Sequence, residues 1–200
     1  TGGTAVDEDA LYSYSITTSD VDSDSSDSWT ITSTSVSWLT MTDAGDGTAT
    51  LAGTPANGDV GSHSVTVTVA DAAGATDTET FSIAVANTND APTITSTAVT
   101  AATEDAVYTY TVTAADVDSS DTITLTGTTV PSWATFTAST GVLTGTPLNA
   151  DVGDNSVVIT ASDGTASVTD TFTIVVANTN DAPTITSTAV TAATEDAVYT

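Results

Sequence analysis

The residues of this chain that could carry out chemistry are mainly acids and amides, and they recur in one order. A Glu-Asp pair is followed by Asp-x-Asp, then by a single Asp, and then by Asn-Thr-Asn-Asp. Sets of carboxylate, amide and backbone oxygens suit Ca²⁺, whereas zinc and copper prefer imidazole or thiolate. The first predicted set of ligands is Glu8, Asn87, Asn89, Asp90, Asp116, Asp118 and Asp163. The equivalent positions elsewhere in the chain are Asp20, Asp22, Asp71, Glu104, Asn178, Asn180 and Asp181.

The competing interpretation is that these residues only form turns, because Asp and Asn favour loops. Asp46-Gly47 is interpreted in that way. For the recurring acids, the charge balance favours a metal. The chain has 26 Asp and Glu, no Lys or Arg and one His, for a net charge of −26. The neutralising cations must therefore come from solvent, while nucleic acids and anionic membrane surfaces are excluded as partners because their phosphates would be repelled.

Enzymatic activity finds little support in the sequence. The single histidine, His63, lies in a predicted polar turn and aligns with Asn155 of a second repeat, so no base is available for a nucleophilic triad. No nucleophile elbow, phosphate loop or metalloprotease motif occurs. Paired carboxylates can hydrolyse glycosides, but here they fall at predicted domain ends without a basic residue beside them. We predict that the chain is not an enzyme.

A tandem repeat sets the architecture. Residues 86–109 recur without change at 177–200, which gives a period of 91 residues. The predicted domains are residues 1–90, residues 91–181 and the opening strands of a third repeat at 182–200. Because the sequence starts and stops within patterned repeats, we expect it to be an excerpt of a longer array.

Within each repeat the apolar residues alternate with threonines. Tyr108, Tyr110 and Val112 alternate with Thr109 and Thr111. This period of two predicts half-buried strands, and about seven of them in about 90 residues predict an immunoglobulin-like sandwich. The fold class is therefore all-β, with tandem seven-stranded sandwiches. The chain has no Cys, so packing alone must hold the core, with Trp38 and Trp133 as its predicted anchors.

The strand order also places the acids. In a seven-stranded sandwich the loop after the second strand and the loop before the seventh lie at one end. The Glu before the second strand and the closing Asn-Asp lie at the other end. Stacking two sandwiches end to end would bring the first set of predicted ligands together.

At these residues the chain resembles bacterial cadherin-like repeats of giant surface adhesins (the dystroglycan-type cadherin-like, or putative-Ig, domain). The motifs that carry the resemblance are 131–153, 157–164 and the ANTNDAP segments at 86–92 and 177–183. The resemblance implies calcium ligands at the Glu before strand two, at the Asp-x-Asp and at the later Asp. The acidic Asp-Arg-Glu segment of cadherins is missing, and Ala86 and Ala177 replace the first linker Asp, which implies one or two ions per junction.

Three functions are compatible with these features. The leading one is an extracellular, cell-surface or secreted module that extends an adhesin and is stiffened by Ca²⁺, with neighbouring repeats as partners and no direct membrane contact. A second is a glycan-binding or homophilic module, for which Trp29 is the best aromatic candidate. A third is a filament or surface-layer subunit, in which residues 182–200 add as a strand to an identical chain.

Overall fold

The computed structural model describes residues 4–21, 30–33, 36–198 and 200, and their regular structure is almost entirely strand. The helical elements of this part are two one-turn 3₁₀ segments, η1 (Asn57–Asp59) and η2 (Asn149–Asp151). Among the described residues no helix has the length and apolar character needed to cross a membrane. The predicted all-β class is confirmed.

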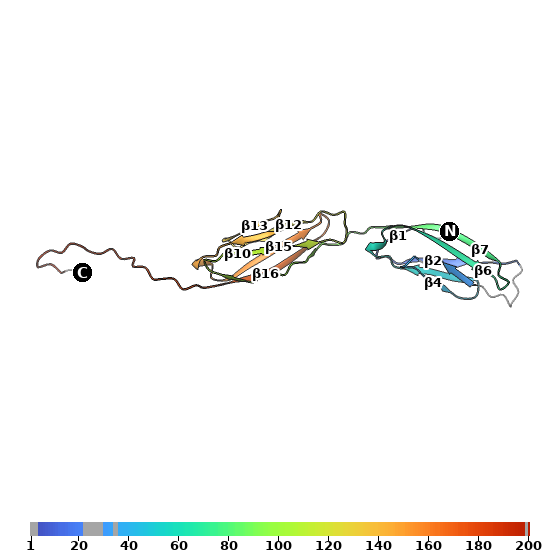
Figure 1. Ribbon diagram of the computed structural model, residues 1–200, viewed down its shortest axis with the longest axis horizontal. Helices are drawn as coiled ribbons and strands as arrows, with labels where there is room; N and C mark the ends of the chain where they lie inside the picture. The colour runs from blue at the N-terminus through green and yellow to red at the C-terminus, as the bar shows by residue number, and fades with distance from the viewer. Residues whose placement is uncertain (1–3, 22–29, 34–35, 199) are drawn as a thin grey trace. The chain divides into compact units, whose positions relative to one another are not determined.

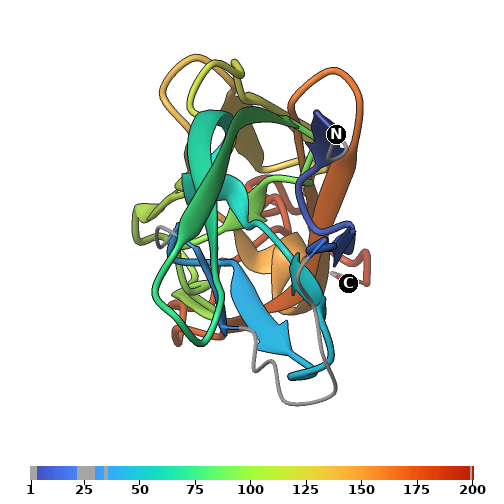
Figure 2. The ribbon, with the colours of Figure 1, turned by 90° about the vertical axis from the view of Figure 1, so that its right-hand side faces the viewer.

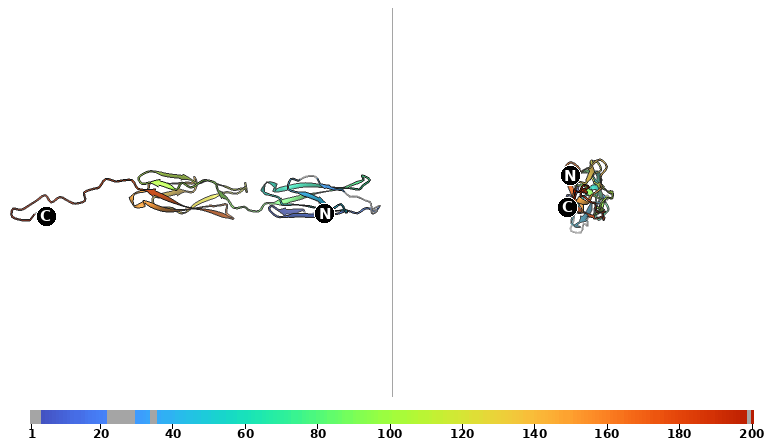
Figure 3. Two further views of the ribbon diagram at one scale, coloured as in Figure 1. Left: turned by 90° about the horizontal axis from the view of Figure 1, so that it is seen from below. Right: turned by 90° about the vertical axis from the view of Figure 1, so that its left-hand side faces the viewer.

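Two sheets make up the first repeat (Figures 1 and 3). One has the order β1-β7-β6-β3 and the other the order β2-β5-β4. β1 runs parallel to β7, whereas the pairings of β6 with β7, β3 with β6, and β5 with β2 and β4 are antiparallel. The long β6–β7 hairpin is visible in Figure 2. The bounds are β1 (Ala5–Asp7), β2 (Tyr12–Thr17), β3 (Thr30–Ser33), β4 (Thr40–Asp43), β5 (Thr48–Gly53), β6 (Gly61–Ala70) and β7 (Thr76–Ala86).

The second repeat has the same arrangement with one addition. Its two main sheets have the orders β12-β15-β16-β9 and β10-β14-β13, and β8 pairs with β11 in a separate ladder. β9 again runs parallel to the last strand, β16. The bounds are β8 (Thr93–Ile94), β9 (Ala101–Thr103), β10 (Tyr108–Thr111), β11 (Ala114–Ala115), β12 (Thr124–Thr129), β13 (Ala134–Thr137), β14 (Val142–Gly145), β15 (Gly153–Ser162) and β16 (Ser167–Ala177).

The cores follow the alternation seen in the sequence. In the second repeat Tyr108, Tyr110 and Val112 are buried and the threonines between them are exposed. Leu143, on β14, is completely buried, as is its counterpart Leu51 on β5 of the first repeat. Alternate residues of a strand point to opposite faces, so the period of two places one face of each strand in the core.

Trp38 and Trp133 pack against the two cores as predicted, although both are only half-buried. The Trp133 indole N–H donates to Oδ1 of Asn155 (3.0 Å). In the first repeat His63 replaces this asparagine, and its ring meets the Trp38 ring edge to face at 6.0 Å. The prediction that His63 lies in a polar turn is wrong, because it lies within β6 and is half-buried.

Tyr108 supplies a pH-dependent contribution to the second repeat. Its hydroxyl donates to the carbonyl of Val99 (2.7 Å), and burial, with a smaller effect of Tyr110, raises the pKa of Tyr108 to about 12. An acid with a raised folded-state pKa contributes stability that is complete below its unfolded pKa of about 10 and is lost as the pH rises through the folded value. The free energy of unfolding of this repeat should therefore fall between pH 10 and pH 12.

Urea unfolding at a series of pH values, followed by circular dichroism, would measure this decline. Tyr108→Phe removes the hydroxyl, so the variant should start from a lower stability and decline less over the same range. An equal decline in the variant would assign the alkaline sensitivity to other groups.

The chain divides into two compact units. The first comprises residues 1–93 together with 114–124 and 161–168, and the second comprises the remaining residues. The predicted repeat boundaries at 90 and 181 stay a prediction. The division matters for the site, because the acidic loops at 114–124 and 161–168 belong to the first unit.

Candidate metal centre

Glu8 is buried because the turn between β1 and β2 is fixed by its backbone. The N–H of Glu8 donates to the carbonyl of Ala86 (2.9 Å), and the N–H of Asp9 donates to the carbonyl of Pro55 (2.8 Å). Asp9 has a φ of 59°, a left-handed conformation that Asp adopts more readily than most residues. The Glu8 side chain is left 2% exposed. Its Oε1 accepts the N–H of Thr88 (2.6 Å), while Oε2 is buried without a hydrogen-bond partner.

Two further acids belong to the same group. The N–H of Asp90 donates to Oδ2 of Asp118 (2.8 Å), and the N–H of Asp118 donates to Oδ1 of Asp116 (3.0 Å). Asp118 is 5% exposed. Oδ2 of Asp90 and Oδ2 of Asp116 are buried and have no hydrogen-bond partner. The backbone therefore orients these carboxylates but leaves oxygens available for another ligand.

Glu8, Asp90 and Asp118 form what we call the acidic triad. One carboxylate oxygen from each residue lies within 4.8 Å of the others. Like charges at this separation repel one another, and removing them from water adds a further cost. Since the chain contains no Lys or Arg, a bound cation is the natural compensation. Buried carboxylate oxygens without a hydrogen-bond partner, from Glu8, Asp90 and the neighbouring Asp116, fit Ca²⁺, which takes several oxygen ligands.

Asp163 lies beside this group in the first unit and is held by a different set of donors. Its Oδ1 accepts the N–H groups of Thr165 and Ala166 (2.6 Å each), and its Oδ2 accepts the side-chain amide of Asn89 (3.0 Å). Hydrogen bonds from Ala166, then from Asn89 and Thr165, lower the pKa of Asp163 below its ordinary value. Donors directed at a carboxylate favour its charged form, so Asp163 stays ionised.

Asn57 is a member of this region that the sequence analysis missed. Its side-chain Oδ1 is buried without a partner. A cavity of about 310 Å³ is lined by Asn57, Asp90 and Asp116, together with Ala91, Thr93, Ala115 and Val117. The equivalent residue of the second repeat, Asn149, donates its amide to Asp181. The shared pattern Thr-Pro-x-Asn-x-Asp at 54–59 and 146–151 was the signal that could have found it.

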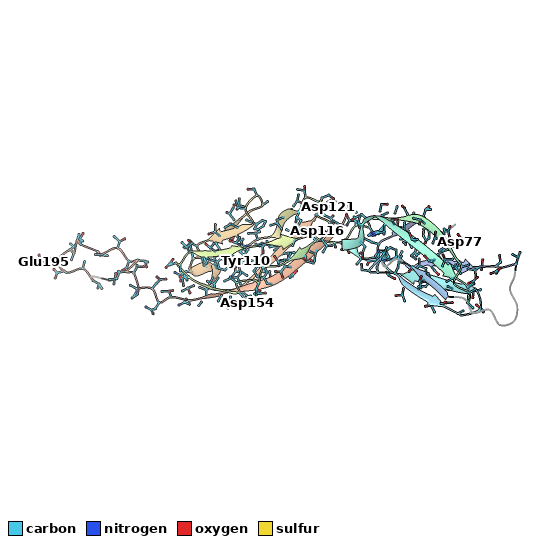
Figure 4. The ribbon with its side chains drawn as sticks, turned by 45° about the vertical axis from the view of Figure 1, so that its right-hand side comes forward. Asp77, Tyr110, Asp116, Asp121, Asp154 and Glu195 are labelled. Atoms are coloured by element: carbon cyan, nitrogen blue, oxygen red, sulfur yellow. The ribbon has the colours of Figure 1, made fainter. Side chains whose placement is uncertain are left out.

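The other predicted ligands have varied surroundings. Glu104 repeats the setting of Glu8: it is 2% exposed, Oε2 accepts the N–H of Thr179 (3.0 Å), and Oε1 is buried without a partner. Asn87, Asn178, Asn180 and Asp181 are exposed. Asp20 and Asp71 line a separate cavity in the first repeat, and Asp22 and Trp29 lie outside the described residues. Within the part of the chain that the structure describes, only the acidic triad brings three such groups together. Figure 4 labels Asp116 and Asp121 on the loop after β11.

Several solved structures are similar to this chain, whereas no curated protein matches it in sequence. The endo-fucoidan hydrolase MfFcnA4 of glycoside hydrolase family 107 is 28% identical, with a TM-score of 0.41 over 90% of this chain and 28% of that protein. The human desmocollin-1 ectodomain is 15% identical, with a TM-score of 0.49 over 90% of this chain and 40% of that one. The protocadherin gamma B4 extracellular domain is also 15% identical, with a TM-score of 0.49 over 89% of this chain and 32% of that one. This chain thus spans less than half the length of these proteins.

Both repeats also match one family model, over residues 1–86 and 91–177. These ranges cover most of the chain and coincide with the two sets of strands described above. The tandem sandwiches, the parallel pairing of β1 with β7 and of β9 with β16, and the match over both repeats agree with the resemblance inferred from the motifs. The chain belongs to the Putative Ig domain (He_PIG) family, with two copies of the domain in tandem.

Proposed function

We propose that this chain is an extracellular, non-catalytic spacer module whose successive repeats are tied together by calcium. The observation that carries the proposal is the acidic triad, in which Glu8 and Asp118 are almost fully buried and Oε2 of Glu8 has no partner. A buried carboxylate oxygen without a donor is costly. A divalent cation offsets that cost.

The ligands come from both repeats in sequence. Glu8 and Asp90 belong to the first repeat, and Asp116 and Asp118 belong to the second. A cation bound by these carboxylates links the two repeats through charge, and without the cation the same carboxylates repel one another. Calcium therefore acts as the switch between a stiff and a loose array. Asn57 and the Asn89–Asp163 pair are available to complete the oxygen shell.

The expected affinity fits a module that works outside the cell. Calcium sites in extracellular modules bind at about 10⁻⁴–10⁻³ M. Extracellular calcium fills such sites and cytosolic calcium does not. A stiffened array would hold an adhesive domain away from the cell surface, with neighbouring repeats as the direct partners of this chain.

Small-angle X-ray scattering tests this function. In calcium the wild-type chain should have a larger maximum dimension and a narrower distribution of distances than in EGTA. Asp118→Asn should behave in calcium as the wild type does in EGTA. Asp154→Asn removes an exposed carboxylate of β15 and serves as the control, which should respond to calcium like the wild type. Identical wild-type curves in calcium and in EGTA would refute the proposal.

A further inference from the structure

One dipeptide of the first repeat is chemically reactive by itself. Asn57-Gly58 is the single Asn-Gly pair of the chain. In such a pair the backbone nitrogen of the glycine can attack the side-chain carbonyl carbon of the asparagine. Glycine favours this step because it has no Cβ to crowd its nitrogen and because its backbone is less restricted than that of other residues. The sequence therefore contains a position at which an asparagine can lose its side-chain amide without an enzyme.

This reaction, deamidation, needs only water. The nitrogen of Gly58 loses its proton to solvent and bonds to Cγ of Asn57, the bond from Cγ to the side-chain nitrogen breaks, and ammonia leaves. Water then opens the resulting succinimide at one of its two carbonyl carbons. The product is aspartate, or isoaspartate in which the backbone runs through the former side chain, and each carries a new carboxylate. No oxidant or reductant takes part.

The local structure leaves the pair open to this reaction. Asn57 and Gly58 lie in η1, a single 3₁₀ turn in which the N–H of Asp59 donates to the carbonyl of Ala56 (2.7 Å). The N–H of Val60 lies 3.5 Å from the carbonyl of Asn57, longer than a usual N–H···O bond. A turn with so few hydrogen bonds opens without unfolding the sandwich. Gly58 is exposed, and among the described residues no acceptor takes its N–H.

The amide that is lost belongs to the candidate metal centre. Oδ1 of Asn57 is buried without a hydrogen-bond partner. Asn57 lines the cavity of about 310 Å³ together with Asp90 and Asp116, and Oδ2 of each of these acids is also buried without a partner. A carboxylate at position 57 adds a third negative group to the lining of this cavity. Deamidation here therefore changes the charge of the metal centre and not only that of an exposed turn.

We propose that Asn57 is a site of spontaneous deamidation, which converts a neutral amide of the candidate metal centre into a carboxylate. Without a cation, the added charge repels Asp90 and Asp116 and destabilises the first repeat. With calcium, the added charge strengthens binding, since the affinity of oxygen sites for calcium depends on the number of charged ligands. The calcium affinity of the module then increases with the age of the protein. This consequence rests on the proposed function, whereas the deamidation itself does not.

The second repeat contains a matched position that should resist the reaction. Asn149 has the place in η2 that Asn57 has in η1, but Ala150 follows it. The Cβ of Ala150 hinders the approach of its nitrogen to Cγ of Asn149. The side-chain amide of Asn149 also donates to Asp181, whereas in the described part of the chain no group accepts the side-chain amide of Asn57. Both differences protect Asn149.

Peptide mapping of the folded chain, aged in mildly alkaline buffer with EGTA, tests the proposal. An endoprotease that cuts before aspartate releases residues 46–58 and residues 121–150, each with a single asparagine. The fragment 46–58 should progressively gain one mass unit or acquire a new cut before position 57, while the fragment 121–150 stays unchanged. Gly58→Ala, whose added Cβ meets no atom within 4 Å, should slow the change at least tenfold.

The chain unfolded in urea serves as the reference for the reactivity of the dipeptide itself. Conversion in urea without conversion in the folded chain would mean that η1 protects Asn57, and this result would overturn the proposal. Equal rates for the folded wild type and Gly58→Ala would overturn it as well, because the change in mass would then not depend on the attack by the glycine nitrogen.

Isothermal titration calorimetry with calcium tests the consequence for the metal centre. Asn57→Asp reproduces the aspartate product and should bind calcium about tenfold more tightly than the wild type. Ser156→Asp adds one charge on the exposed face of β15 and should bind calcium like the wild type. A wild type that binds no calcium would refute the proposed function, whereas a wild type that binds calcium as tightly as Asn57→Asp would refute only this consequence. In either case conversion of Asn57 in EGTA supports the modification site.

Discussion

Calcium should raise the unfolding temperature of the wild-type chain, and Glu8→Gln should lose most of that increase. A ligand that binds only the folded state stabilises it by RT ln(1 + [L]/Kd). For a dissociation constant of about 10⁻⁴–10⁻³ M, 10 mM calcium gives about 1.4–2.7 kcal/mol. Differential scanning calorimetry with calcium and with EGTA measures the change directly.

The Glu8→Gln variant has a second expected effect with the opposite sign. Glutamine has the same shape and keeps an oxygen that can accept the N–H of Thr88, but it removes one charge from the acidic triad. In EGTA the variant should be more stable than the wild type, because the repulsion on Asp90 and Asp118 is lower. In calcium it should be less stable. Glu195→Gln changes the same Glu-Asp motif where the side chain is exposed, and it should follow the wild type in both buffers. A Glu8→Gln variant that is equally destabilised with and without calcium would indicate a packing role alone.

Gly53→Ala should destabilise the first repeat by about 1–3 kcal/mol, the usual cost of forcing extra volume into a packed site. Gly53 ends β5, where the chain passes close to the backbone of Trp38. A Cβ added at this glycine would lie 1.8 Å from the carbonyl oxygen of Trp38. Backbone cannot move aside as a flexible side chain does. The end of β5 would have to move away from the backbone of Trp38. This movement would disturb the pairing of Gly53 with Tyr12 on β2.

Thermal unfolding followed by circular dichroism would detect this change, at about 4–8 °C per kcal/mol for a domain of this size. Gly58→Ala in the same repeat is the matched control, because a Cβ there meets no atom within 4 Å. Gly145→Ala should reproduce the effect in the second repeat, where the added Cβ would lie 2.2 Å from the carbonyl oxygen of Trp133. Equal unfolding temperatures for Gly53→Ala and Gly58→Ala would contradict the steric account.

Comparison of the two repeats also explains why the acidic positions do not behave alike. Glu8 and Glu104 are both 2% exposed, and each has one oxygen that accepts an N–H and one without a partner. Only Glu8 belongs to a group of three close carboxylates within the described residues. We therefore expect calcium to bind first at the acidic triad, and Glu104 to need acids from another repeat.

The sequence by itself determined the strands, their buried faces and the recurring acids. Burial depends on which face of a strand a residue occupies, and the alternation of apolar and polar residues along a strand identifies the buried face. Tyr108, Tyr110 and Val112 are buried as this alternation predicts. The 91-residue period predicted two similar units, because matching motifs recur in the same order in both repeats. The charge of −26, in a chain without Lys or Arg, made a cation the expected partner before any contact was known.

Tertiary structure decided which of those acids meet. The separation of Glu8, Asp90 and Asp118, and the burial of the Asn57 oxygen, depend on how loops distant in sequence pack, which no local pattern encodes. His63 was misplaced for a similar reason: a polar sequence resembles a turn, but its ring fits the position beside Trp38 that Asn155 occupies beside Trp133.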